Sequence, residues 1–344
     1  MGNGKKVLVA MSGGVDSSTA ALVLLRAGYA VEGATLLLRP EGAVPDPGAR
    51  RVCEALGIPL HLIPAGREFS ERVIIPAARE YDAGRTPNPC CECNELLKFA
   101  LLLDFVRSHG FAALATGHYA RVDASGLRRG ADRAKDQSYF LYRLGRDTLK
   151  SLVFPLGDLT KPEVRRIADA AQLPAAKRPD SQDLCFAVPG EHCTDTLLRR
   201  AGIPPRPGKV FFRGRVVGSH PGIHRCTVGQ RGGLNVALGV PAYVKRIDAA
   251  AAAVELCTDR EELASRVFRL ERTNWQQTPP GEDETLELQI RYRSRPVGCR
   301  VFREDGRWRV ETDEKLHAVT PGQAGVLYRG DLVVGGGVIA AEDL

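Results

Sequence analysis

The sequence lacks a long apolar run. No stretch approaches the roughly 20 consecutive apolar residues that a membrane-spanning helix requires. Residues 1–6 lead directly into the first predicted strand, without the apolar segment of a signal peptide. We therefore expect a cytoplasmic protein with no membrane partner.

Two common nucleotide-binding motifs are also missing, since the sequence contains neither G-x-x-x-x-G-K-[ST] nor G-x-G-x-x-G. The Cys-x-x-Cys at Cys90 and Cys93 has no second copy, which disfavours the usual structural zinc site. Nine cysteines in a cytosolic chain do not indicate a disulfide scaffold. At this point a redox dithiol and a chance juxtaposition both remain open for Cys90, Cys91 and Cys93.

The charge balance has a small positive excess. The chain carries 48 Lys and Arg against 41 Asp and Glu, a net charge of +7. This excess modestly favours a polyanionic partner. With 344 residues, the chain is long enough for two or three domains.

A Ser/Gly-rich segment, AMSGGVDSS at residues 10–18, lies between a predicted buried strand at 7–9 and a predicted helix at 19–25. A strand, a glycine turn and a helix start in this order favour an anion site, because the first helical N–H groups lack partners. Gly13 and Gly14 permit close approach of a ligand to the backbone. A turn that only caps the helix is the alternative.

Strands and helices alternate through the first half of the sequence. Helical spacing predicts helices at 49–56, 68–83 and 96–106, with a kink or break at Pro76 and a loop at 86–94. A further helix is predicted at 161–171, with Thr160 as its cap and Pro162 in its first turn. Apolar runs predict strands at 30–38, 58–63 and 111–115. This alternation predicts an α/β fold with a doubly wound parallel sheet, whose ligands lie beyond the carboxyl ends of the strands.

The composition changes after about Gly190, where glycines, prolines and short alternating runs predominate. The turn Glu304-Asp305-Gly306 between two apolar runs is typical of a β-hairpin. We therefore predict two smaller β-rich domains, the second barrel-like, after the α/β domain. The predicted domains are 1–195, 196–264 and 265–344.

The loop SGGVDSS resembles the pyrophosphate loop (PP-loop) of the ATP pyrophosphatase superfamily. Further blocks resemble tRNA-specific 2-thiouridylases and follow in the same order along the chain. They are GRTPNP at 84–89, CN at 93–94, KF at 98–99, ATGHYAR at 115–121, KDQSYFL at 135–141, FPLG at 154–157, DSQDLCF at 180–186, TVGQR at 227–231 and TPGQ at 320–323.

The resemblance implies ATP-dependent 2-thiolation of the wobble uridine of tRNA. ATP would adenylate the C2 oxygen, and sulfur would then replace AMP. The resemblance makes Cys93 the nucleophile and Cys185 the residue that receives a persulfide, and it allows the two to form a disulfide when sulfur is released. It implies ATP and Mg²⁺ as cofactors, and tRNA and a sulfur carrier or cysteine-desulfurase-derived persulfide donor as partners. We expect a monomer.

The resemblance also assigns binding residues. ATP would be held by Ala10, Met11, Ser12, Gly13, Gly14, Val15, Asp16, Ser17, Leu36 and Gly117. The tRNA would be contacted by Asn88, at the target base, and by His118, Lys135, Asp136, Gln137, Arg291, Tyr292 and Gln323. Asp16 suits magnesium or the phosphate side of the site, and it could equally cap the helix.

One position departs from a common family pattern, because Cys90 stands where many members carry Asp. Cys90, Cys93 and Cys185 could therefore ligate a 4Fe–4S cluster, and the persulfide and cluster mechanisms both stay open. Two other functions also stay open. They are a PP-loop ATP pyrophosphatase acting on a small molecule and a non-catalytic RNA-binding iron–sulfur protein.

Overall fold

The computed structural model describes residues 4–39, 47–180 and 184–341, which form two compact units. Unit 1 contains Met1–Phe69, Cys90–Gln182 and Asp331–Val334. Unit 2 contains Ser70–Pro89, Asp183–Gly330 and Gly335–Leu344. Each unit therefore consists of segments that are separated in the sequence, and each is described by itself.

Unit 1 is built on a five-stranded sheet in the order β3-β2-β1-β4-β7, and every neighbouring pair is parallel. The central strand β1 carries three consecutive buried apolar residues, Val7, Leu8 and Val9, as expected where both faces of a sheet are covered. The sheet confirms the predicted α/β class. Its strands are β1 (Lys6–Ala10), β2 (Ala30–Leu37), β3 (Leu60–Pro64), β4 (Ala113–Ala115) and β7 (Leu152–Val153).

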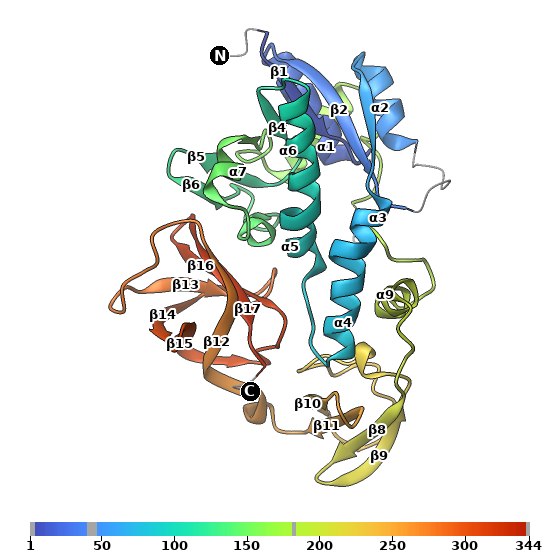
Figure 1. The fold of residues 1–344 in the computed structure, drawn as a ribbon, viewed down its shortest axis with the longest axis vertical. Helices are drawn as coiled ribbons and strands as arrows, with labels where there is room; N and C mark the ends of the chain where they lie inside the picture. The colour runs from blue at the N-terminus through green and yellow to red at the C-terminus, as the bar shows by residue number, and fades with distance from the viewer. Residues whose placement is uncertain (1–3, 40–46, 181–183, 342–344) are drawn as a thin grey trace. The chain divides into compact units, whose positions relative to one another are not determined.

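Helices accompany these strands (Figure 1). Val9 of β1 packs in one buried cluster with Leu24 of α1 and Val52 of α2. Thr160 and Glu163 form a capping box at the start of α8, which confirms the predicted helix cap. The helices with residues in unit 1 are α1 (Val15–Arg26), α2 (Gly48–Leu56), α3 (Gly66–Phe69), α5 (Pro89–Cys93), η2 (Asn94–Lys98), α6 (Phe99–Ser108), η3 (Ser138–Leu141), α7 (Arg146–Lys150) and α8 (Lys161–Ala170), and the hairpin β5 (Ala120–Asp123) and β6 (Gly126–Arg129) completes it.

Two helical segments, around residues 86–94 and around Pro76, can be compared with what the sequence predicts. The predicted loop at 86–94 is wrong in its second half, because α5 begins at Pro89, a residue whose fixed φ suits a first helical position. The chain does not break at Pro76, where the sequence predicts a kink or break: a π-helical turn, η1 (Ser70–Ile74), leads directly into α4 (Ile75–Asp82). Pro76 has no N–H to donate and its ring crowds the preceding turn, which accounts for the irregularity there.

Unit 2 contains a four-stranded sheet and a closed barrel. The sheet has the order β10-β11-β8-β9, and its apolar face includes Val210, Val244 and Val254. Its elements, with the helices beside it, are α9 (Cys193–Ala201), β8 (Gly208–Phe212), β9 (Arg215–His220), η4 (Ile223–Arg225), β10 (Tyr243–Asp248), β11 (Ala253–Cys257) and η5 (Arg260–Leu263).

The barrel follows the strand order β12-β15-β14-β13-β16-β17, and antiparallel pairing of β12 with β17 closes it. Asp305 and Gly306 both have positive φ, at 48° and 78°, and form the predicted hairpin turn between β14 and β15. The closed barrel confirms the predicted barrel-like domain. Its strands are β12 (Ala264–Trp275), β13 (Leu286–Gln289), β14 (Val297–Glu304), β15 (Arg307–His317), β16 (Ala324–Arg329) and β17 (Leu332–Ile339).

The three predicted domain ranges stay a prediction, because the two compact units are discontinuous in sequence. In the part of the chain that the structure describes, no helix combines the length and apolar character that crossing a bilayer would need.

Candidate active site

The Ser/Gly loop joins β1 to α1, as the sequence predicts. Gly14 is the residue at the N-cap of α1, and the Ser17 and Ser18 hydroxyls donate to its carbonyl oxygen over 3.2 and 2.8 Å. The Ser12 amide donates to Ser17 Oγ over 3.2 Å, so the turn folds back on the helix start. Gly13 has φ +78°, and a Cβ there would lie 2.6 Å from the Ala49 amide nitrogen. The loop therefore requires glycine at position 13.

The loop lies at the point where the strand order of the sheet reverses, since β1 lies between β2 and β4. Gly117 follows β4, and a Cβ on it would lie 2.8 Å from the backbone of Asp16 and Ser17. Leu36 lies near the carboxyl end of β2, where the neighbouring Thr35 hydroxyl donates to the Met11 carbonyl over 2.7 Å. Unit 1 thus brings together the segments predicted to bind ATP, at the edge where such sheets bind ligands.

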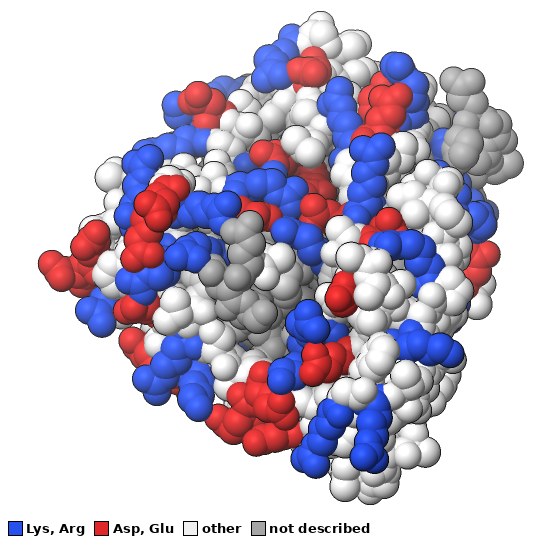
Figure 2. Space-filling view, turned by 60° about the horizontal axis from the view of Figure 1, so that its bottom comes forward, with Lys and Arg blue, Asp and Glu red and all other residues white. Residues whose placement is uncertain are grey.

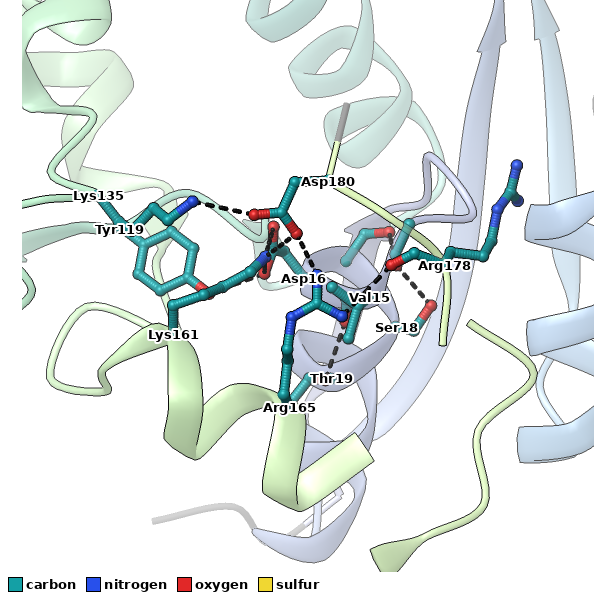
Figure 3. Close-up of polar contacts among 12 residues, drawn as sticks. Val15, Asp16, Ser18, Thr19, Tyr119, Lys135, Lys161, Arg165, Arg178 and Asp180 are labelled. Carbon is teal, nitrogen blue, oxygen red and sulfur yellow. Dashed lines mark hydrogen bonds and ion pairs between the residues drawn. The ribbon is translucent and has the colours of Figure 1, made fainter. Parts of the chain in front are cut away.

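Asp16 is the acidic residue of this loop, and two side chains hold it (Figure 3). Lys161 Nζ, at the start of α8, lies 2.7 and 2.8 Å from the two carboxylate oxygens. The Tyr119 hydroxyl donates to Asp16 Oδ1 over 2.7 Å. Burial and the charge of Asp16 raise the pKa of Tyr119, so its hydroxyl keeps its proton and donates at neutral pH.

A second carboxylate, Asp180, shares Lys161 with Asp16. Lys135 and Lys161 each lie 2.9 Å from its oxygens, and Arg165 lies 2.5 Å away (Figure 3). Burial alone would raise the pKa of Asp180, but the hydrogen bonds from Lys135 and Lys161 outweigh it and lower the pKa to about 2. Asp180 is therefore ionised at neutral pH.

Two arginines connect this group of charged side chains to the glycine turn. Arg178 donates to the Gly13 carbonyl over 3.1 Å, and Arg165 donates to the Arg178 carbonyl over 3.3 Å. Lys161, Arg165 and Arg178 lie at this site although the sequence did not predict them as site residues. Lys161 is separated from Asp16 by 145 positions, and only the predicted helix start marked this segment. Cations beside unpartnered helix N–H groups make this end of unit 1 suited to a polyphosphate.

Three residues predicted to contact tRNA fix the conformation and position of the loop that carries them. Lys135 pairs with Asp180, and Gln137 Oε1 accepts the Tyr119 amide over 3.0 Å. Asp136 is buried and accepts hydrogen bonds from the Gly130 amide at 2.9 Å and the Ser138 hydroxyl at 2.9 Å. Their role toward tRNA stays a prediction.

His118 lies directly after Gly117, between the rings of Phe99 and Phe154, whose centroids are 5.9 and 6.1 Å away. Its Nδ1 lies 2.7 Å from the Thr116 hydroxyl. Burial, followed by the charge of Lys98, lowers the pKa of His118 well below its ordinary value, so the ring is neutral at neutral pH. A neutral ring can contact a base or ribose but adds no charge toward phosphate.

The α5 cysteines differ in burial. Cys91 is fully buried, whereas Cys90 and Cys93 lie on the helix with intermediate exposure. Burial raises the pKa of the Cys90 thiol despite the opposing charge of Lys98. Cys185, in unit 2, is exposed. Across residues 4–39, 47–180 and 184–341, no group of three or more His, Cys, Asp or Glu side chains is arranged to hold a metal ion.

The predicted tRNA residues of unit 2 are partly brought together. Gln323 Nε2 donates to the Thr86 carbonyl over 2.8 Å, two residues before Asn88. Arg291 Nη2 donates to Thr320 Oγ1 over 3.0 Å, in the same turn as Gln323. The Tyr292 carbonyl accepts the Gln289 side chain over 2.6 Å.

A Ser/Gly loop at the switch point of a parallel sheet, ringed by cations, defines a nucleotide-binding α/β protein, and comparison with known families agrees. The family model "tRNA methyl transferase HUP domain" matches residues 5–189. The "tRNA methyl transferase PRC-barrel domain" matches 197–258, and the "Aminomethyltransferase beta-barrel domain" matches 265–339.

Three similar curated proteins make the class more specific. A tRNA-specific 2-thiouridylase MnmA 1 of Syntrophus aciditrophicus is 44% identical, covering 97% of this chain and 92% of its own. A tRNA-specific 2-thiouridylase MnmA of Chloroflexus aurantiacus is 43% identical, covering 98% and 99%. The protein of the same name from Moorella thermoacetica is 43% identical, covering 96% and 98%. The chain belongs to the tRNA-specific 2-thiouridylase family.

Proposed function

We propose that this protein uses ATP to replace the C2 oxygen of the wobble uridine of tRNA with sulfur. The observation that carries this proposal is the group of cations beside the Ser/Gly loop, in a chain that matches 2-thiouridylases over nearly its whole length. The intact loop argues against a non-catalytic RNA-binding protein. Two β-rich domains beyond the loop domain argue against a small-molecule substrate, which would not need them.

In the first step, a uridine C2 oxygen attacks the α-phosphate of ATP and pyrophosphate leaves. The loop N–H groups and the Ser12 and Ser17 hydroxyls would bind the phosphates, while Lys161 and Arg178 would neutralise the charge that develops on pyrophosphate. Asp16 is a carboxylate of the kind that Mg²⁺ prefers, so it would hold the metal, whose chemistry is to stabilise the leaving group. The activated C2 oxygen then leaves as part of AMP.

In the second step, the terminal sulfur of a Cys185 persulfide attacks C2 and AMP leaves. The Cys93 thiolate then attacks Sγ of Cys185, and the electrons of the broken S–S bond pass to the sulfur on C2. The products are 2-thiouridine and a Cys93–Cys185 disulfide, which a thiol reductant must reduce before the next cycle. The exposure of Cys185 suits its loading by a sulfur carrier.

The 4Fe–4S cluster remains the second candidate for handling sulfur, because Cys90 completes a Cys-x-x-Cys with Cys93. Such a cluster would need Cys90 and Cys93 of unit 1 together with Cys185 of unit 2. The pKa of the partly buried Cys90 thiol is raised by desolvation, which makes Cys90 a poorer nucleophile than an exposed cysteine.

The tRNA surface would be electrostatically mixed. Figure 2 shows Lys and Arg side chains interleaved with Asp and Glu over the face in view, and no large area of one sign is visible. Many of the cations are paired, as Lys245 is with Glu262 over 2.8 Å. The RNA would thus be positioned by scattered backbone contacts.

The deciding experiment is anaerobic purification followed by iron and sulfide analysis and a thiolation assay with unmodified tRNA, ATP and a sulfur source. Wild type is compared with Cys90→Ala, Cys93→Ala and Cys185→Ala, with Cys193→Ala as a control outside the motifs. We expect wild type and Cys193→Ala to produce 2-thiouridine and AMP. Cys93→Ala and Cys185→Ala should produce no 2-thiouridine.

The remaining outcomes separate the alternatives. Iron that disappears together with activity in Cys90→Ala would establish the cluster and refute the two-cysteine scheme. An iron-free protein with an active Cys90→Ala variant would support the persulfide scheme. AMP formation at the same rate with and without tRNA would indicate a small-molecule substrate. If no AMP forms at all, the non-catalytic RNA-binding alternative would be supported.

A further inference from the structure

The turn Thr320–Gln323 of unit 2 is docked on the segment that carries Asn88. The Thr86 amide donates to the Pro321 carbonyl over 2.8 Å. In the opposite direction, Gln323 Nε2 donates to the Thr86 carbonyl over 2.8 Å and to the Pro87 carbonyl over 3.4 Å. Between them, a Cβ on Gly322 would lie 2.9 to 3.0 Å from backbone atoms of Thr86, so the two backbones touch.

The segment 86–89 has few backbone N–H groups with which to form hydrogen bonds of its own. Pro87 and Pro89 lack N–H groups and both are buried, and a residue before proline is kept out of helical geometry. The carbonyls of Thr86 and Pro87 therefore need donors from elsewhere in the fold. A buried carbonyl left without a donor is costly, and the single amide group of Gln323 serves both.

The turn itself is fixed to the barrel. The Gly322 amide donates to the Ile339 carbonyl over 2.9 Å, and the Ile339 amide donates to the Gln323 carbonyl over 2.8 Å. Thr320 is buried, and its hydroxyl receives Arg291 Nη2 at 3.0 Å. Arg291 also donates to the Ala318 carbonyl over 2.6 Å. A rigid barrel edge therefore supports the segment before Asn88.

We propose that Gln323 is a positioning residue for the loop that carries Asn88, and that it acts by fixing the Thr86 and Pro87 carbonyls. The proposal rests on the proposed function and on the prediction, from the family resemblance, that Asn88 contacts the target base. It gives the barrel a part in thiolation that is separate from holding tRNA, because a shift of Asn88 misplaces the uridine C2 without weakening contacts elsewhere on the RNA.

The test measures steady-state thiolation and tRNA binding for the full chain, using wild type, Gln323→Ala and Gln323→Glu. Glutamate keeps the shape of glutamine but presents oxygens, which repel the two carbonyls. We expect kcat to fall about 10- to 100-fold in both variants, because a small misplacement of a reacting group has effects of this size. The Kd for tRNA at fixed salt should change less than about twofold, because the backbone contacts that dominate RNA affinity remain. Lys315→Ala, an exposed barrel variant that loses an ion pair with Glu261, should match wild type in both measurements.

A second measurement keeps the proposal independent of catalysis. Hydrogen exchange of the Thr86 amide, which donates to the Pro321 carbonyl, should be about fivefold faster in Gln323→Ala, because losing one hydrogen bond between the turn and this segment makes local opening easier. A rise in Kd with unchanged kcat at saturating tRNA would show that Gln323 is an RNA contact and overturn the proposal. Unchanged exchange would overturn it as well. If wild type itself does not thiolate tRNA, the proposed function fails, while the exchange result still decides whether Gln323 holds the segment.

Discussion

Asp16 and Asp180 share one ammonium group, that of Lys161, whose side chain is only 10% exposed. A polyphosphate that approaches the loop meets this lysine already in place and desolvated, which strengthens its attraction for the incoming charge. At the scale of single residues, Lys161 is therefore the side chain whose loss should affect the phosphate site most.

The first prediction concerns this lysine. Lys161→Ala should lower tRNA-dependent AMP release about 100-fold, the effect typical of removing a charged group that stabilises a transition state. Lys150→Ala removes a lysine that also forms an ion pair, with Asp147 at 2.7 Å, but on the exposed surface, and its activity should stay within twofold of wild type. Comparable AMP release from Lys161→Ala and wild type would show that Lys161 has no role in phosphate chemistry.

The second prediction concerns pH. The folded pKa of Asp180 is about 2, below the ordinary value of 3.8, so its ion pairs stabilise the fold above pH 3.8 and are lost as the pH falls toward 2. Asp180→Asn should lower the free energy of unfolding at pH 7 by about 2 kcal/mol. Guanidinium unfolding of the two proteins should show this difference shrinking between pH 4 and pH 2. A difference that persists at pH 2 would have to come from packing.

At the scale of elements, the close approach of the segment after β4 to the start of α1 shapes the proposed phosphate site. The third prediction is that Gly117→Ala weakens ATP binding about tenfold or more, because a Cβ would meet the Asp16 and Ser17 backbone at 2.8 Å and displace the helix start. Gly145→Ala is the matched control, since nothing lies within 4 Å of a Cβ there. Calorimetric titration with ATP compares them, and equal affinities would mean that α1 tolerates the displacement.

Local patterns predicted the elements well, and distant pairings explain what they missed. The strand, glycine turn and helix around Gly13 follow from neighbouring residues, as does the Thr160 cap. The start of α5 was missed because two prolines and three cysteines near residue 90 suggest a loop more strongly than a helix. Lys161, Arg178 and Gln323 were beyond local reasoning, since their partners are 145, 165 and 237 positions away.

At the scale of the whole molecule, the net charge is +7, and Lys and Arg side chains are interleaved with Asp and Glu over the face shown in Figure 2. The fourth prediction is that tRNA affinity falls about 100-fold between 50 and 200 mM salt, as expected when four or five phosphates are neutralised. Filter binding at several salt concentrations gives the slope, with ATP binding as a less salt-sensitive comparison. A tRNA affinity independent of salt would contradict binding through the RNA backbone.

The chain passes between the two units five times, and the short segment Asp331–Val334 returns to unit 1 almost at its end. Arg128 of the β5–β6 hairpin pairs with Leu332, which belongs to this segment. The pairing of β6 with β17 can therefore form only after the polypeptide has been synthesised as far as residue 332, later than the other segments of unit 1. A truncation before Leu332 would therefore remove a strand pairing from unit 1 together with part of the barrel, so that the two units would lose stability together.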